Sequence, residues 1–136
     1  MAATAVVDTG FLVALLRDRD IHRDWAAAMA AEFPTPWHTC EAVLAETFHL
    51  LSPHARPAIA ELLNLRALLV SFSFRENQSP VLGLMQKYAA LPADLADACI
   101  VRMSELLSDP VVLTTDDHFR VYRRHSRHVI PCRLPD

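Results

Sequence analysis

The sequence predicts an α/β protein with three layers, α/β/α, in which helices cover both faces of a central, mostly parallel sheet. Short β-branched runs alternate with helical segments of about 10–15 residues, which is typical of βαβ units. The chain has 136 residues, 52% hydrophobic and 21% charged, enough to bury the core of one domain. No repeat or low-complexity linker divides it, so we expect a single domain over residues 1–136.

The first half of the chain begins with a strand of β-branched and apolar residues, Thr-Ala-Val-Val. Pro34 and Pro36 end the second helix, Thr39 is the expected N-cap of the third, and Pro57 suits the first turn of the fourth. The expected elements are a strand at 4–7, helices at 11–17 and 20–33, a strand at 37–38, helices at 39–51 and 57–65, and a strand at 68–74.

The second half continues the alternation. Pro80 and Pro92 precede helical segments, while Pro110 and Asp116 bracket the clearest strand of the chain. The expected elements are helices at 80–90 and 94–107, a strand at 111–115, a short helix at 117–124 and a strand at 129–130. In such sheets, ligands bind beyond the carboxyl ends of the strands.

Composition excludes several classes of site. Two isolated glycines, Gly10 and Gly83, cannot form a dinucleotide-binding loop or a P-loop. Cys40, Cys99 and Cys132 form no C-x-x-C pair, which argues against a zinc ribbon or redox motif and fits a reducing, cytoplasmic location. We expect no signal peptide and no membrane contact, because no apolar run approaches about 18 residues.

Two acids directly follow predicted buried strands. Asp8 comes after Thr-Ala-Val-Val and Asp116 comes after Val-Val-Leu-Thr-Thr. Asp is common after strands because it caps the next helix, so each residue alone is equally well explained as a cap. Their carboxylates nevertheless fall where a parallel sheet binds its ligands.

Three further acids lie on predicted helices. Glu46 has mostly apolar neighbours one turn away, which places it on or beside the buried face; the alternatives are an Arg ion pair or a boundary position with its head in water. Asp94 and Asp97 share one face of a first helical turn, where acids complement the helix dipole and Asp94 is a candidate N-cap. Ile100 and Val101 turn the face of Asp97 inward.

Together these positions predict three to five carboxylates around one pocket. Such a cluster cannot remain ionised without cations, and hard oxygen ligands select Mg²⁺ or Mn²⁺, which in turn bind phosphate. The formal charge of −3 argues at first against a nucleic-acid partner, but without these five acids the remaining residues carry +2.

The same residues resemble, in order, the motifs of PIN-domain ribonucleases of the VapC toxin type. Val-Val-Asp8-Thr9 resembles the first motif, Glu41-Ala-Val-Leu-Ala-Glu46 the second, Asp94-Leu-Ala-Asp97-Ala the third, and Leu-Thr-Thr-Asp116 with Phe119 the fourth. The resemblance extends from Ala5 to about Pro131. It implies a PIN-like fold and an endoribonuclease that hydrolyses RNA phosphodiesters with Mg²⁺ or Mn²⁺.

The resemblance also implies roles for the residues. Asp8, Glu46, Asp97 and Asp116 form the expected catalytic metal set, and Asp94 is the next candidate, so the choice between Asp94 and Asp97 as direct ligand stays open. The Thr9 hydroxyl would orient Asp8 or a bound water. The cations would polarise the scissile phosphate and activate a water for in-line attack, with no side-chain nucleophile.

Toxin members of this family are silenced by a small antitoxin and commonly form homodimers, so the resemblance implies both partners. The segment from His118 to Arg133 contains five Arg and three His and no acid. Arg120, Arg123 and Arg124 could therefore contact RNA or the antitoxin, form a solvated helix face, or pair with acids elsewhere. Position 117 is an Asp, where many relatives carry a basic residue.

Other functions fit the sequence less well. A haloacid-type phosphatase needs an acid at position 10, which is Gly, and a phosphoacceptor receiver domain needs a late Lys, whereas the single Lys is Lys87. The remaining alternatives are a PIN-domain nuclease that is not a toxin, and a catalytically weak PIN-like module that binds RNA or protein.

Overall fold

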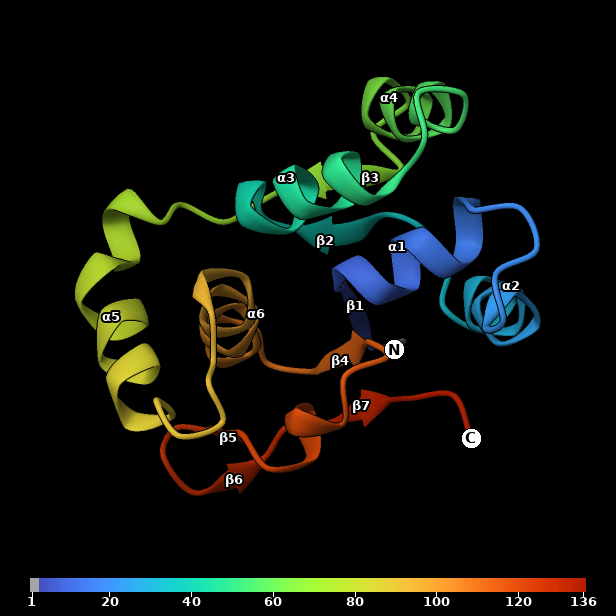
Figure 1. Cartoon of the computed structure of the whole chain (residues 1–136). Coiled ribbons are helices and arrows are strands. Elements are labelled where there is room, and N and C mark those ends of the chain that lie inside the picture. The colour runs from blue at the N-terminus through green and yellow to red at the C-terminus, as the bar shows by residue number, and fades with distance from the viewer. Residues whose placement is uncertain (1–2) are drawn as a thin grey trace.

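Parallel strands form the central sheet of the protein (Figure 1). The structure, a computed structural model, describes residues 3–136. Within that range the sheet has five strands in the order β3-β2-β1-β4-β7, all paired in parallel. Their bounds are β1 (Thr4–Val7), β2 (Trp37–Thr39), β3 (Leu68–Val70), β4 (Pro110–Leu113) and β7 (Cys132–Arg133). The carboxyl ends of β1 and β4 lie together because Val7 pairs with Leu113.

Helices flank this sheet and complete the predicted three layers, α/β/α (Figure 1). Their bounds are α1 (Thr9–Leu16), α2 (Arg23–Glu32), α3 (Glu41–Leu50), α4 (Arg56–Asn64), α5 (Gln78–Lys87) and α6 (Leu95–Leu106). Helix α6 packs against β1 and β4, and α5 packs against α6. Phe11 of α1 contacts Trp25 and Trp37 edge-on, with ring centroids 6.0 and 5.2 Å away, which joins α1 to α2 and β2. None of these helices is long and apolar enough to cross a membrane.

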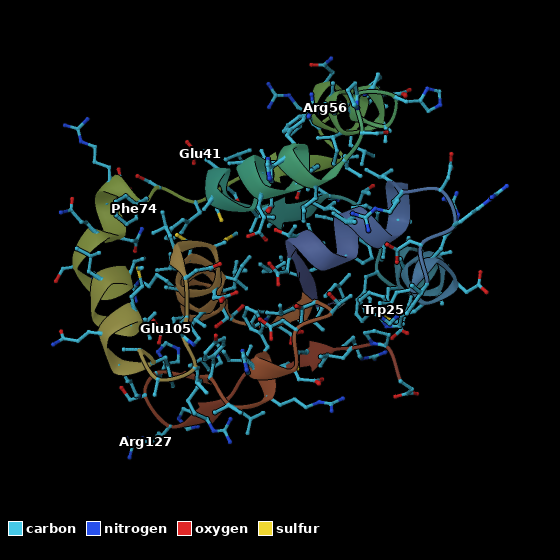
Figure 2. The ribbon with its side chains drawn as sticks, in the orientation of Figure 1. Trp25, Glu41, Arg56, Phe74, Glu105 and Arg127 are labelled. Carbon is cyan, nitrogen blue, oxygen red and sulfur yellow. The ribbon has the colours of Figure 1, made fainter. Side chains whose placement is uncertain are left out.

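The segment after β4 differs from the predicted helix at 117–124. Only a short 3-10 turn, η2 (Asp117–Arg120), forms there, and β5 (Arg123–Arg124) then pairs with β6 (His128–Val129) as an antiparallel hairpin. His125 and Ser126 in the hairpin turn have positive φ angles of 51° and 69°, which a helix does not allow. The helix prediction is therefore wrong beyond residue 120, and Arg127 projects from the hairpin tip (Figure 2).

Two other boundaries differ for local reasons. Thr39 ends β2 instead of capping the next helix, because its hydroxyl donates to the Val7 carbonyl on the neighbouring strand at 3.1 Å, and Cys40 is the N-cap residue. The strand predicted at 68–74 stops at Val70, and the chain leaves the sheet for the 3-10 turn η1 (Arg75–Asn77). Strand β7 was not predicted; its two residues follow Pro131 and pair with the end of β4.

Gly10 allows the first turn of α1 to lie directly against the segment that follows β4. A Cβ atom at this position would lie 1.9 Å from the Thr115 hydroxyl oxygen and 2.9 Å from the Thr115 Cβ. Real side-chain contacts do not approach this closely, so Gly10 is required by packing at the strand ends.

Replacing Gly10 by Ala is expected to destabilise the protein by about 1–3 kcal/mol, because Thr115 must move to admit the new methyl group. Urea unfolding followed by circular dichroism measures the change. Gly83→Ala is the matched control, since a Cβ at this helical position would meet no atom within 4 Å, and it should be neutral or slightly stabilising. Equal stability of Gly10→Ala and wild type would contradict the packing argument.

Candidate metal centre

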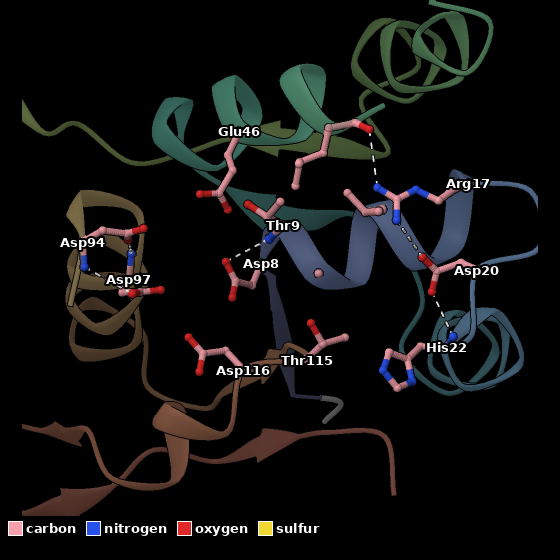
Figure 3. Close-up of a pocket in the computed structure, with 13 residues that line it drawn as sticks. Asp8, Thr9, Arg17, Asp20, His22, Glu46, Asp94, Asp97, Thr115 and Asp116 are labelled. Atoms are coloured by element: carbon pink, nitrogen blue, oxygen red, sulfur yellow. Dashed lines mark hydrogen bonds and ion pairs between the residues drawn. The ribbon is translucent and has the colours of Figure 1, made fainter. Parts of the chain in front are cut away.

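A pocket of about 480 Å³ opens beyond the carboxyl ends of β1 and β4 and brings all the sequence-predicted acids together (Figure 3). The five acids are Asp8, Glu46, Asp94, Asp97 and Asp116. They come from four separate segments of the chain. The wall of the pocket also includes Arg17, Asp20 and His22, which the sequence analysis did not assign to the site.

Asp8 is held by hydrogen bonds at both carboxylate oxygens. It is the N-cap of α1, so Oδ1 accepts the Thr9 backbone N–H at 2.8 Å, and Oδ2 accepts the Thr114 hydroxyl at 2.8 Å. Only 6% of the residue is exposed. Burial raises the pKa of Asp8 to about 6, the charges of Glu46 and Asp116 add to the rise, and the two hydrogen bonds oppose it.

Thr114 is the functional residue that the sequence analysis missed. Its buried hydroxyl donates to Asp8 and accepts the Asp116 backbone N–H at 3.0 Å. The Thr9 hydroxyl lies near the Val43 carbonyl, at 3.5 Å, and within residues 3–136 it makes no hydrogen bond to Asp8; that it orients a bound water stays a prediction. The sequence signal for Thr114 is weak, because Thr114 and Thr115 both precede Asp116 and only the folded strand end shows which hydroxyl turns inward.

Asp116 lies at the other strand end and begins the turn η2. Its Oδ1 accepts the His118 backbone N–H at 2.9 Å, and the His118 ring Nδ1 lies 3.4 Å from the same oxygen. The carboxylate is therefore held on one side by its own turn. Its charge contributes to the raised pKa of both Asp8 and Asp97.

Asp94 and Asp97 form a capping box at the start of α6. Asp94 Oδ1 accepts the Asp97 N–H at 2.9 Å, and Asp97 Oδ2 accepts the Asp94 N–H at 3.2 Å, so the N-cap role considered for Asp94 is confirmed. Asp97 is half-buried. Burial raises its pKa to about 7, and the charge of Asp94 adds to the rise. The buried Tyr122 hydroxyl lies 3.5 Å from Asp97 Oδ2, a long hydrogen bond.

Glu46 lies nearer to solvent than the sequence predicts. The buried residues of α3 are Val43 and Thr47, and Glu46 is on the adjacent, exposed face that lines the pocket. Within residues 3–136 its carboxylate has neither an ion pair nor a hydrogen bond, so the alternative of an Arg ion pair does not occur there. Its free carboxylate faces the buried Asp8 across the pocket (Figure 3).

The donor set fits a hard divalent cation. Carboxylate oxygens are the ligands that Mg²⁺ and Mn²⁺ prefer. Burial, with a smaller contribution from neighbouring negative charges, raises the pKa of Asp8 and of Asp97, and a bound cation would favour the ionised form of both. No three His, Cys, Asp or Glu side chains in the described chain lie close enough to hold one ion as they stand. Mg²⁺ usually keeps several waters and binds through one or two carboxylates, so this spacing suits it.

The three arginines singled out from the sequence lie outside this pocket. One guanidinium nitrogen of Arg124 donates to the carbonyls of Ser104 and Leu107, at the end of α6. Arg123 donates to carbonyls of its own turn, including that of Arg120, whose side chain lies 3.9 Å from Asp117. The carbonyl contacts of Arg123 and Arg124 were not predicted, whereas the ion pair of Arg120 agrees with the alternative of pairing with an acid. Contact of the three with RNA or a protein partner stays a prediction.

Comparison with protein families matches residues 5–124 to the family model described as the PIN domain. The matched range contains all five pocket acids and ends at β5. A search of curated proteins found no match.

Replacing Asp97 by Asn is expected to raise the Tm of the metal-free protein at pH 8 and to change it little near pH 4. The pKa of Asp97 in the folded protein, about 7, lies above its ordinary value of 3.8, so the folded state binds the proton more tightly than the unfolded state. Stability from this group is therefore present at low pH and lost as the pH rises from about 4 to 7. Asn removes that loss and keeps the oxygen that accepts the Asp94 N–H.

Thermal unfolding at the two pH values, in EDTA, measures the difference. Asp24→Asn is the matched control, because Asp24 is exposed in the first turn of α2, outside the pocket, and this change should leave the pH dependence as in wild type. Mg²⁺ should raise the Tm of wild type at pH 8 more than that of Asp97→Asn. A variant less stable than wild type at pH 8 would contradict the electrostatic argument.

Proposed function

Because the chain belongs to the PIN-domain family, whose fold is that of nucleases, we propose that it is an endoribonuclease that hydrolyses RNA phosphodiester bonds with Mg²⁺ or Mn²⁺. One observation carries the proposal: the buried carboxylate of Asp8 and the half-buried carboxylate of Asp97 face one pocket, and burial, with a smaller contribution from like charge, raises the pKa of each. Structural acids are usually paired with cations, whereas these acids are arranged for a cation from solution.

The chain's own residues hold the carboxylates in place before substrate arrives. Asp8, Glu46, Asp97 and Asp116 are the candidate ligands, with Asp94 beside them; one or two of these carboxylates would bind the cation directly and the others through its waters. When bound, the cation would neutralise phosphate charge and make a water molecule more acidic. Thr114 and the capping N–H groups fix the orientation of Asp8, Asp97 and Asp116. Such preorganisation lowers the cost of reaching the transition state.

Water is the proposed nucleophile. The residues that line the pocket include no Ser, Cys or Lys side chain. Thr9 directs its hydroxyl toward the Val43 carbonyl rather than toward a basic side chain. A nucleophilic side chain needs an adjacent base to become reactive, and within residues 3–136 neither Thr9 nor Thr115, the other threonine of the pocket, has a hydrogen bond from its hydroxyl to a basic side chain.

We extend the proposal to the biological role: a toxin of the VapBC type, acting in the cytoplasm as a homodimer and silenced by a small antitoxin. The order of the four acidic motifs supports this role, because it is the order seen in VapC-type toxins. A PIN-domain nuclease that is not a toxin would use the same site.

Cleavage of RNA is expected to require Mg²⁺ or Mn²⁺ and to stop when EDTA is added. Asp8→Asn and Asp97→Asn should each reduce the cleavage rate by about a hundredfold or more, because each removes a charge that holds the cation. Cleavage of a fluorescent RNA pool, followed by gel or fluorescence, measures the rates. Asp24→Asn is the control for a carboxylate outside the pocket and should cleave like wild type.

Robust cleavage by both pocket variants would overturn the site assignment. No cleavage by wild type over a broad set of RNAs would overturn the proposed activity. Hydrolysis of a phosphomonoester that depends on Asp8, with RNA untouched, would favour a phosphatase.

Expression of the chain alone in bacteria is expected to arrest growth, whereas Asp8→Ala at equal expression should not, because it lacks the buried carboxylate of the site. Growth curves with immunoblot measurement of both proteins provide the test. Healthy growth with abundant wild-type protein would contradict the toxin role and leave the nuclease assignment intact.

A further inference from the structure

The acidic pocket has a second end that the proposed hydrolysis does not use. It extends along α1 from Gly10 past Val13 to Arg17, and along α3 from Glu46 to Leu50. Asp94 and Asp97 lie at one end, and Arg17 lies at the other with Asp20 and His22 (Figure 3). The two ends differ in chemistry, because carboxylates gather at the first and a guanidinium lies at the second.

Arg17 is held at the pocket wall by contacts that do not use all of its N–H donors. One terminal nitrogen lies 3.5 Å from Asp20 Oδ2, and the other lies 3.5 Å from the Leu50 carbonyl oxygen at the end of α3. Asp20 is itself fixed, since its side chain is only 10% exposed and Oδ1 accepts the His22 N–H at 2.9 Å. The Arg17 side chain is 48% exposed, and its long contacts leave N–H donors free for a ligand.

Arg17 is too far along α1 to serve as a partner of the catalytic acids. It comes eight positions after Thr9, which corresponds to about 12 Å of helix rise. Among the described residues that line the pocket, it is the only Lys or Arg, together with six acids. Between the two ends the wall is apolar, with Val13 and Leu50 one turn from Arg17 and Glu46 respectively.

The pocket is large enough for more than one phosphate. Its volume of about 480 Å³ lies within the range of about 300–1,000 Å³ found for sites that hold multi-ring ligands. A scissile phosphate at the carboxylate end therefore leaves room in the pocket for the next part of the RNA strand. The apolar section suits a sugar or base, and the guanidinium suits the following phosphate, to which Arg binds with two N–H donors.

We propose that Arg17 is a positioning residue that binds a backbone phosphate of the RNA next to the scissile one. This inference rests on the proposed nuclease function and adds to it a residue that positions the RNA strand next to the scissile phosphate. A contact with phosphate carries no sequence information, so Arg17 sets the register of the strand and not the base preference.

The test measures cleavage of matched oligoribonucleotides by wild type, Arg17→Ala, Arg17→Lys and Arg23→Ala. The cleaved linkage is first mapped on wild type, and each neighbouring phosphate is then replaced in turn by an uncharged methylphosphonate. Arg23 is the matched control, because its side chain is about as exposed as that of Arg17, pairs with Asp18, and lies outside the pocket. It also donates to the Arg17 backbone carbonyl at 3.3 Å, a contact that does not involve the Arg17 guanidinium. Thermal unfolding of each variant verifies that it is folded.

We expect Arg17→Ala to lower kcat/KM on the natural strand by about tenfold, mainly through KM, and Arg17→Lys to retain part of the rate. When the phosphate that Arg17 contacts is the one replaced by methylphosphonate, wild type and Arg17→Ala should cleave the strand at nearly equal rates, because the contact between Arg17 and a charged phosphate is then absent from both. The slope of log affinity against log salt should fall by about 0.7 in Arg17→Ala. Arg23→Ala should match wild type throughout.

A folded Arg17→Ala that cleaves the natural strand like wild type would overturn the inference alone. An equal loss on the natural strand and on every methylphosphonate strand would also overturn it, because a purely structural role predicts that pattern. No RNA cleavage by wild type would remove the proposed function and this inference with it.

Discussion

The Thr114 hydroxyl joins the two strand ends on which the carboxylate site is built. It donates to Asp8 after β1 and accepts the backbone N–H of Asp116 after β4. Both strands pair in register up to Val7 and Leu113, so the residues that follow them meet at one edge of the sheet. Thr114 is fully buried, so water cannot replace either bond. One side chain thus couples the direction of a buried carboxylate to the path of the opposite loop.

Burial of the acids and repulsion among them lower the stability of the folded protein when the acids are ionised. The pKa of Asp8 rises to about 6 and that of Asp97 to about 7, chiefly because burial removes water from each carboxylate. Such a cluster holds together because the acids are fixed by hydrogen-bond donors from their own helix starts and from Thr114. The apolar sheet beneath them, with β4 buried along its whole length, supplies the stability that the acids remove.

The sequence predicted the layers and the acids well, because both depend on local patterns. Buried parallel strands are recognisable as short β-branched runs, and acids at their ends fall where such sheets bind ligands. It could not place residues whose role depends on contacts between distant segments. Thr39 bonds to Val7 across the sheet rather than capping a helix, and Thr114 rather than Thr9 contributes the hydroxyl to Asp8. A hairpin follows residue 120 in place of the rest of the helix expected at 117–124. Arg124 of this hairpin donates to carbonyls at the end of α6, a contact with a distant segment that a local pattern does not reveal.

Different hydrogen bonds hold the two ends of helix α6 in place. The capping box of Asp94 and Asp97 begins it, while Arg124 binds the carbonyls of Ser104 and Leu107 at its end and Glu105 accepts the His125 N–H at 2.7 Å. A helix of 12 residues is a stiff rod about 18 Å long. The basic hairpin therefore holds one end of the same stiff element that carries Asp97 in its first turn. The hairpin lies outside the pocket, yet it shares a rigid support with one of the pocket's acids.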